Sequence, residues 1–168
     1  MRQFAGFRFC EPRGLLSGAF ALAFATIASV GLPPSAYAVD TSVSYDAPDL
    51  TSVRAKIKAK DWKAAIGELT RMLDTNRHAD VYNLLGFSLR KTRDYDNALY
   101  HYRKALELDP NHKGAQEYLG ELYVETGQMD KAKAMLASLQ KLCPSGCEER
   151  EDLEKAIAAG PGIAAKPR

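Results

Sequence analysis

Residues 79–112 read ADVYNLLGFSLRKTRDYDNALYHYRKALELDPNH, and residues 113–146 read KGAQEYLGELYVETGQMDKAKAMLASLQKLCPSG. The two stretches share a Leu-Gly pair, a later alanine and a proline near the end, each recurring at a spacing of 34 residues. These pairs are Leu85-Gly86 and Leu119-Gly120, Ala98 and Ala132, and Pro110 and Pro144. An internal repeat of this length is typical of arrays built from stacked helix pairs.

The pattern resembles the tetratricopeptide repeat (TPR), which combines a large residue, Leu-Gly, an aromatic, small residues and a proline at fixed offsets. In the first stretch these positions hold Tyr82, Leu85-Gly86, Leu89, Ala98, Tyr102, Ala105 and Pro110. In the second stretch they hold Gln116, Leu119-Gly120, Tyr123, Ala132, Leu136, Leu139 and Pro144. The second stretch departs from the family at Gln116, Leu136 and Leu139, and the first departs at Leu89.

A more divergent unit precedes these two. Residues 61–66, DWKAAI, parallel residues 94–99, DYDNAL, at a shift of 33. The apolar residues upstream are spaced to form one face of a first helix: Leu50, Val53 and Ile57. We therefore expect a TPR domain over 49–146, made of a divergent repeat at 49–78 and two further repeats at 79–112 and 113–146.

The predicted fold is all-α: a short right-handed α-solenoid of about three TPR helix pairs plus a C-terminal capping helix. One repeat cannot bury its apolar face alone, so the units must stack. Glycines and alanines at the repeated positions let helices approach closely, and Asp61 and Asp94 are placed to cap second helices. We expect the capping helix at 147–160, a flexible tail at 161–168 and a disordered leader at 39–48.

Residues 1–38 have the order of a secretory signal peptide: basic residues, an apolar run and a small-x-small site at 36–38. We expect cleavage after Ala38, with an uncut membrane anchor as the alternative. The segment holds three of the 23 Lys and Arg residues and one of the 21 Asp and Glu residues, which leaves 20 of each. A mature domain without net charge has no general attraction for nucleic acid or anionic lipid. The expected localisation is periplasmic or secreted, with no stable membrane insertion after cleavage.

Cys143 and Cys147 remain in the mature chain, separated by Pro144, Ser145 and Gly146. Export places them in an oxidising compartment, and the residues between them favour a turn, so we expect a structural disulfide. A soft-metal site or a redox switch are the alternatives, because two thiolates can also hold Cu(I).

Catalysis has little support in the sequence. The three histidines, His78, His101 and His112, lack the i, i+4 spacing of a metal pair and are expected to be exposed. There is no phosphate-binding glycine loop after a strand and no nucleophile elbow. We expect no enzyme activity, no cofactor and no metal.

The resemblance implies that first helices line a groove that binds a protein or peptide. The groove positions in the two clear repeats are Asn83, Phe87, Arg90, Lys91, Glu117, Glu121 and Glu125. The three glutamates lie four residues apart and so form one stripe, which is at least as consistent with a solvated helix face as with binding. The cationic clamp by which some TPR proteins hold a terminal carboxylate is absent, because only Arg54 among the matching positions is cationic.

The function we expect is an extracytoplasmic protein-binding adaptor or assembly factor that uses the TPR groove. Two alternatives stay open: a thiol-redox or copper-handling protein that uses Cys143 and Cys147, and a structural module of a larger envelope complex.

Overall fold

A computed structural model describes residues 43–161 of the chain, which form seven α-helices in that range. The helices are α1 (Thr51–Lys58), α2 (Trp62–Met72), α3 (Ala79–Lys91), α4 (Tyr95–Leu108), α5 (Lys113–Glu125), α6 (Met129–Leu142) and α7 (Glu148–Ala159). The expected all-α TPR solenoid is confirmed. The signal peptide and residues 162–168 lie outside the described residues. None of the described helices combines the length and the hydropathy needed to cross a bilayer.

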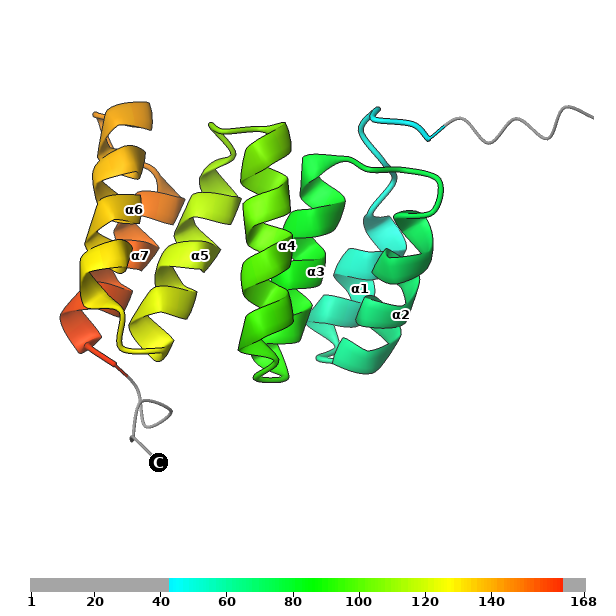
Figure 1. The fold of residues 1–168 in the computed structure, drawn as a ribbon, viewed down its shortest axis with the longest axis horizontal. Helices are drawn as coiled ribbons and strands as arrows, with labels where there is room; N and C mark the ends of the chain where they lie inside the picture. The colour runs from blue at the N-terminus through cyan, green and yellow to red at the C-terminus, as the bar shows by residue number, and fades with distance from the viewer. Residues whose placement is uncertain (1–42, 162–168) are drawn as a thin grey trace, which may run out of the picture. The chain divides into compact units, whose positions relative to one another are not determined.

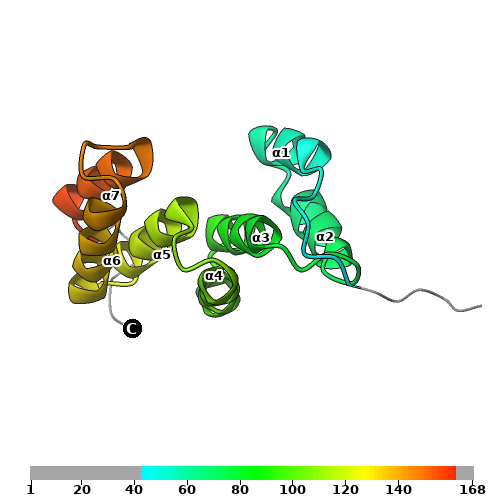
Figure 2. The same ribbon diagram turned by 90° about the horizontal axis from the view of Figure 1, so that it is seen from above.

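The helices pack as successive pairs, each helix against its neighbours in the chain, and α7 packs against both α5 and α6 (Figure 1). Seen along the row from above, α1, α3, α5 and α7 lie on one side, and α2, α4 and α6 lie on the other (Figure 2). The first helix of every pair therefore contributes to the same face, and α7 extends that face beyond the third pair.

Polar caps fix where the helices begin. The side chains of Asp61 and Asp94 accept hydrogen bonds from the backbone N–H groups of Ala64 and Asn97, at 3.1 and 3.4 Å. Each cap satisfies a backbone donor that the first turn leaves without an intrahelical partner. His78 caps α3 in the same way and His112 caps α5, in each case through the ring nitrogen Nδ1. The expectation that these two histidines are exposed is wrong, because capping holds both rings half-buried.

Two glycines set the closest helix contacts. A Cβ built on Gly86 would lie 2.8 Å from the ring of Tyr102, which is fully buried on α4. A Cβ built on Gly120 would lie 2.5 Å from Leu153, which is fully buried on α7. Both distances are too short for carbon atoms in contact, so only glycine allows the helices to pack at this separation.

Residues 43–48 differ from the disordered leader that we expected at 39–48. The backbone N–H of Ser44 donates to the carbonyl of Thr75 at 2.8 Å, and its carbonyl accepts from the N–H of Arg77 at 2.8 Å. Asn76 also donates from its side chain to the carbonyl of Asp46 at 2.9 Å. These bonds form an isolated β-bridge that holds the described part of the leader against the loop between α2 and α3. The sequence gave no sign of them, because such a bridge is made by backbone groups.

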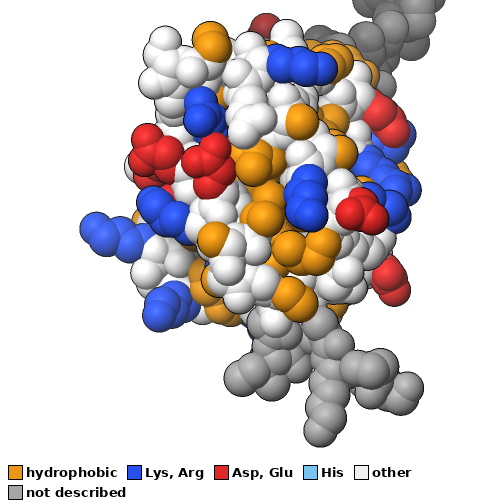
Figure 3. Space-filling view, turned by 90° about the vertical axis from the view of Figure 1, so that its left-hand side faces the viewer, with side chains coloured by type: hydrophobic (Ala, Val, Ile, Leu, Met, Phe, Trp, Pro, Cys, Tyr) orange, Lys and Arg blue, Asp and Glu red, His pale blue; other side chains and the backbone are white. Residues whose placement is uncertain are grey.

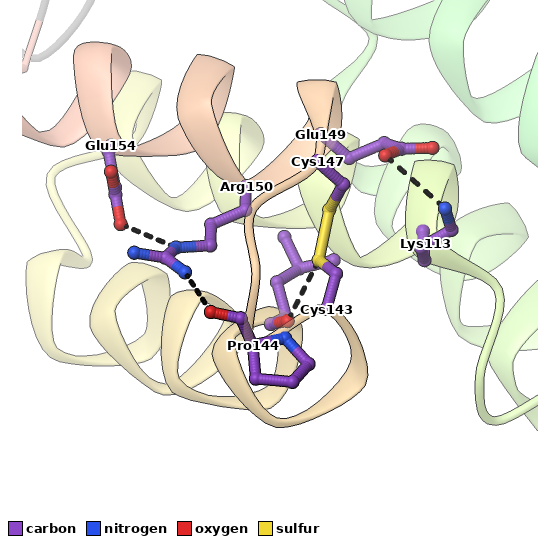
Figure 4. Close-up of a disulfide and its surroundings, with 8 residues drawn as sticks. Lys113, Cys143, Pro144, Cys147, Glu149, Arg150 and Glu154 are labelled. Atoms are coloured by element: carbon purple, nitrogen blue, oxygen red, sulfur yellow. Dashed lines mark hydrogen bonds and ion pairs between the residues drawn. A yellow bond between two sulfur atoms is a disulfide. The ribbon is translucent and has the colours of Figure 1, made fainter.

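A disulfide joins the end of α6 to the start of α7. The sulfur atoms of Cys143 and Cys147 are 2.10 Å apart, and the two residues flank these helices directly (Figure 4). Arg150 of α7 donates to the carbonyl oxygen of Pro144 at 3.3 Å, which closes the same turn a second time. On the chain-entropy model, a closed loop of this length stabilises the folded state by about 2 kcal/mol.

The end of the array formed by α6 and α7 is not wholly polar. Figure 3 shows a band of hydrophobic side chains on this end, with charged side chains to either side. Several apolar residues of the two helices pack only partly into the core: Met129, Met135, Ala156 and Ile157. A terminal helix in a solenoid ordinarily presents a polar outer face, so α7 caps the array incompletely.

The glycine contacts generate a test of the packing. We expect Gly86→Ala to lower the free energy of unfolding by about 1–3 kcal/mol, because the added methyl group meets both an aromatic ring and the carbonyl oxygen of Ala98. Gly67→Ala is the matched control, since it lies inside α2 with its nearest neighbouring atom 3.9 Å away. That substitution should stabilise the protein by about 0.5–1 kcal/mol through helix propensity. Urea unfolding followed by circular dichroism measures both, and equal effects at the two positions would contradict the packing described.

Candidate functional site

The seven predicted groove residues all come from α3 and α5, on the side of the row that also carries α1 and α7. Two hollows lie on this side. The first, the acidic hollow, has a volume of about 310 Å³ and is bounded by residues of all four helices. Asn83 and Glu117 line it. The second, the distal hollow, has a volume of about 270 Å³ and is lined by residues of α3, α5 and α7. Arg90, Lys91, Glu121 and Glu125 line it.

Arg90 is not a free cation of the groove, contrary to our expectation. Its side chain is only 2 % exposed, and it forms ion pairs with both Glu121 and Glu125. Its Nε atom also donates to the hydroxyl of Tyr102 at 3.4 Å. Although burial opposes the charge, Tyr102 and the two carboxylates hold the pKa of Arg90 above its ordinary value. A buried guanidinium must be paired to be tolerated, so Arg90 and the two glutamates tie α3 to α5.

Phe87 lies at the centre of an aromatic cluster between the two hollows. Its ring centre is 4.8 Å from that of Tyr118 on α5 and 6.0 Å from that of Trp62 on α2. The ammonium group of Lys91 lies 5.0 Å from the centre of the same ring, a cation–π contact at the edge of the face. Phe87 is half-buried rather than fully presented to the groove. Truncating it would therefore disturb packing as well as any contact with a partner.

Glu117 occupies an unusual place for an acid. The residue is 8 % exposed, and no ion pair or side-chain hydrogen bond involves it among the described residues. Burial, together with the charges of Glu121, Asp152 and Glu149, raises the pKa of Glu117 to about 8. The interpretation of Glu117 as part of a solvated stripe is therefore wrong. Glu121 and Glu125, the other members of the stripe, are half-buried against Arg90.

Asn83 lies on α3 exactly one repeat before Glu117. The residue is 5 % exposed, and its side-chain oxygen Oδ1 has no hydrogen-bond partner within the described part of the chain. Nearby, His112 accepts the N–H of Ala115 at Nδ1, at 3.0 Å, and approaches the carboxylate of Asp80 through Nε2 at 2.9 Å. Because Nδ1 accepts, the ring proton belongs on Nε2 and is donated to Asp80. This pair links α3 to α5 at the edge of the acidic hollow.

The cysteine pair lies away from this face, at the turn between α6 and α7. Within residues 43–161, no three His, Cys, Asp or Glu side chains converge in a way that would hold a metal ion. The groups around the disulfide that the structure records are Arg150, Glu154, Lys113 and Glu149, paired with one another or with the backbone (Figure 4).

Sequence reasoning missed several residues that shape the face. Trp62, Tyr118, His112 and Asp80 did not appear among the groove positions, and neither did the α7 acids Glu148, Glu149 and Asp152, which line the acidic hollow. One available signal was the spacing between repeats, since Gly114 and Asp80 are 34 residues apart, as are Glu117 and Asn83. Residues that share a repeat position lie on the same face, so the burial of one indicates the environment of the other.

Comparison with known proteins agrees with this architecture. Two sequence models described as tetratricopeptide repeat match residues 50–112 and residues 89–142. Together they span residues 50–142, which is more than half of the 168-residue chain. The chain is also similar to a Guillardia theta protein named uncharacterized protein ycf37, at 35% identity over 63 residues. That match covers 38% of this chain and 35% of the relative, so the chain spans about a third of that protein's length. From its helix pairs and its sequence, this chain belongs to the tetratricopeptide-repeat family, whose repeats generally mediate interactions between proteins.

Proposed function

We propose that the protein is an adaptor or assembly factor that acts outside the cytoplasm and holds a segment of another protein on the face formed by α1, α3, α5 and α7. One observation carries the proposal. The acidic hollow is bounded by side chains from the first helix of every pair and from α7: Arg54, Asn83, Glu117 and Asp152 among them. A recess that crosses the whole row can contact an extended segment at several points, as a single-pair pocket cannot.

The chemistry of the face suits a polypeptide. The half-buried rings of Phe87 and Tyr118 offer apolar area together with polar edges, and such aromatic residues are common at the centres of protein interfaces. The exposed Lys91 lies on one side of these rings, and acidic side chains lie on the other. Both signs of charge on one face favour a partner with a matching pattern over a uniformly anionic nucleic acid.

The location outside the cytoplasm is supported by the composition of residues 1–38, which lie outside the described structure. A basic start, an apolar run and a small-x-small site together favour a cleaved signal peptide. The disulfide between Cys143 and Cys147 agrees with an oxidising compartment, where such bonds persist. Stapling the α6–α7 turn would keep the acidic residues of α7 in place beside α5.

A photo-crosslinking experiment tests which face holds the partner. We expect p-benzoylphenylalanine at Lys91, exposed at the edge of the α3–α5 face, to give a discrete crosslinked product in the native host. The reason is that a bound segment would lie within reach of that side chain. The measurement is the pattern of adducts on denaturing gels, followed by identification of the crosslinked peptide.

Arg103 is the matched control, because it is an exposed basic residue on α4, on the other side of the row. The same probe at Arg103 should give little of that product. If the product forms at Arg103 and not at Lys91, partner binding uses the α2–α4–α6 side and the proposed function of the groove fails.

A single intact-mass measurement tests export and oxidation together. Protein recovered from the native host should begin at Val39, because cleavage is expected after Ala38. Without reductant its mass should be two hydrogens below that of the dithiol form, and reduction should restore them. A product that retains Met1 would contradict cleavage, and free thiols in a correctly cleaved product would contradict the disulfide.

A further inference from the structure

The acidic hollow contains two buried groups that both need a hydrogen-bond donor. The Glu117 carboxyl is buried without an ion pair among the described residues, and the Oδ1 atom of Asn83 is buried without a partner. Both residues line the hollow, and they come from adjacent helices of the same face. A buried acceptor without a donor costs free energy. Their juxtaposition therefore points to a ligand that brings N–H groups to this place.

The charge around the two acceptors defines the ligand further. Five acidic side chains line the hollow against one guanidinium, that of Arg54; the acids are Asp80, Glu117, Glu148, Glu149 and Asp152. Three of these acids are already engaged: Asp80 by His112 at 2.9 Å, Glu149 by Lys113 at 3.7 Å and Asp152 by Lys155 at 2.7 Å. Glu117 has no such partner, although it is the most deeply buried of them. A ligand that supplies both positive charge and N–H donors meets the requirements of Glu117 and Asn83 at once.

We propose that the acidic hollow receives a lysine or arginine side chain of the bound protein, with Glu117 and Asn83 as its hydrogen-bond acceptors. The inference rests on the proposed function of the α1–α3–α5–α7 face and specifies the chemistry of its partner. It is the reverse of a carboxylate clamp, because the pocket supplies acceptors and negative charge. The volume of about 310 Å³ accommodates the end of a long side chain. An inorganic cation fits less well, since the acids in the described residues do not converge as a set of three ligands.

Such a site links binding to pH. The pKa of Glu117 is raised to about 8, so in the empty hollow at pH 6 the carboxyl is almost wholly protonated. A cation binds the ionised form more tightly, so affinity should rise with pH, by at most tenfold per unit, until the pH exceeds about 8. The charged and titratable groups that surround Glu117 on the four helices are Arg54 of α1, Asp80 and Arg90 of α3, His112 and Glu121 of α5, and Glu148, Glu149 and Asp152 of α7.

The test uses n-butylammonium chloride as a probe of the lysine side chain, added to isotope-labelled protein spanning residues 39–168, the compact unit that contains all seven described helices. We expect saturable shifts of the Asn83 side-chain amide and the Glu117 carboxyl resonance, with a Kd on the order of 1–10 mM. The apparent pKa of Glu117, read from its carboxyl resonance, should fall when the probe is bound. Sodium chloride and sodium butyrate at the same ionic strength should leave both resonances unchanged.

Glu117→Gln removes the negative charge and keeps the shape, so it should weaken binding of the probe at pH 8 by at least tenfold and abolish the pH dependence. Glu151→Gln is the matched control, because Glu151 is an exposed acid on α7 that does not line the hollow. That variant should bind the probe as the unaltered protein does. Asp152→Asn is a second variant in the hollow, expected to weaken binding less, and it provides the test if Glu117→Gln does not fold.

Three results would overturn the inference: no saturable shift at Asn83 or Glu117, equal binding by the Glu117→Gln and Glu151→Gln proteins, or tighter occupation of the same groups by magnesium chloride. The titration needs no protein partner, so its failure would leave the crosslinking test of the groove intact. Conversely, a positive titration with crosslinks only at Arg103 would keep the cation site and reject the proposed function.

Discussion

The contact between Gly120 of α5 and Leu153 of α7 fixes much of what this face can do. Leu153 is fully buried where the glycine leaves room for it. Asp152 precedes Leu153 in the chain, and Glu149 lies one helical turn before it. Seating Leu153 on α5 therefore brings both acids to the rim of the hollow that contains Glu117. The raised pKa of Glu117 follows from burial and from these neighbours. A small residue in the core thus determines the electrostatics of a surface several side chains away.

Arg90 has the complementary effect at the other end of the same helices. Its ion pairs with Glu121 and Glu125 neutralise two members of the acidic stripe and join α3 to α5. The face is consequently divided: charges are satisfied internally at the distal hollow and remain unsatisfied around Glu117 and Asn83. Removing one partner of a buried charge network costs more than the network contributes as a whole. The distal charges therefore serve the fold, and the acidic hollow is the part of the face with hydrogen-bonding capacity left for a ligand.

Much of the fold could be predicted from the sequence because the repeat encodes it redundantly. The spacing of 34 residues, the glycines at 86 and 120 and the alanines at 98 and 132 each describe the same helix pair. The role of Arg90 could not be read in this way. An exposed arginine and one that bridges to the next repeat have the same local pattern, and only the position of α5 decides between them. The burial of Glu117 likewise depends on α7, which lies outside the repeat that contains it. The histidine caps escaped prediction because capping by an imidazole is uncommon beside capping by Asp or Ser.

The central claim is that the α1–α3–α5–α7 face holds a segment of another protein. Hydrogen–deuterium exchange of the protein with and without the partner identified by crosslinking would test it most directly. The account predicts slower exchange in α3, α5 and α7 on binding, with the exchange of α4 and α6 unchanged. Protection confined to α4 and α6 would contradict the account and place the interaction on the opposite side of the row.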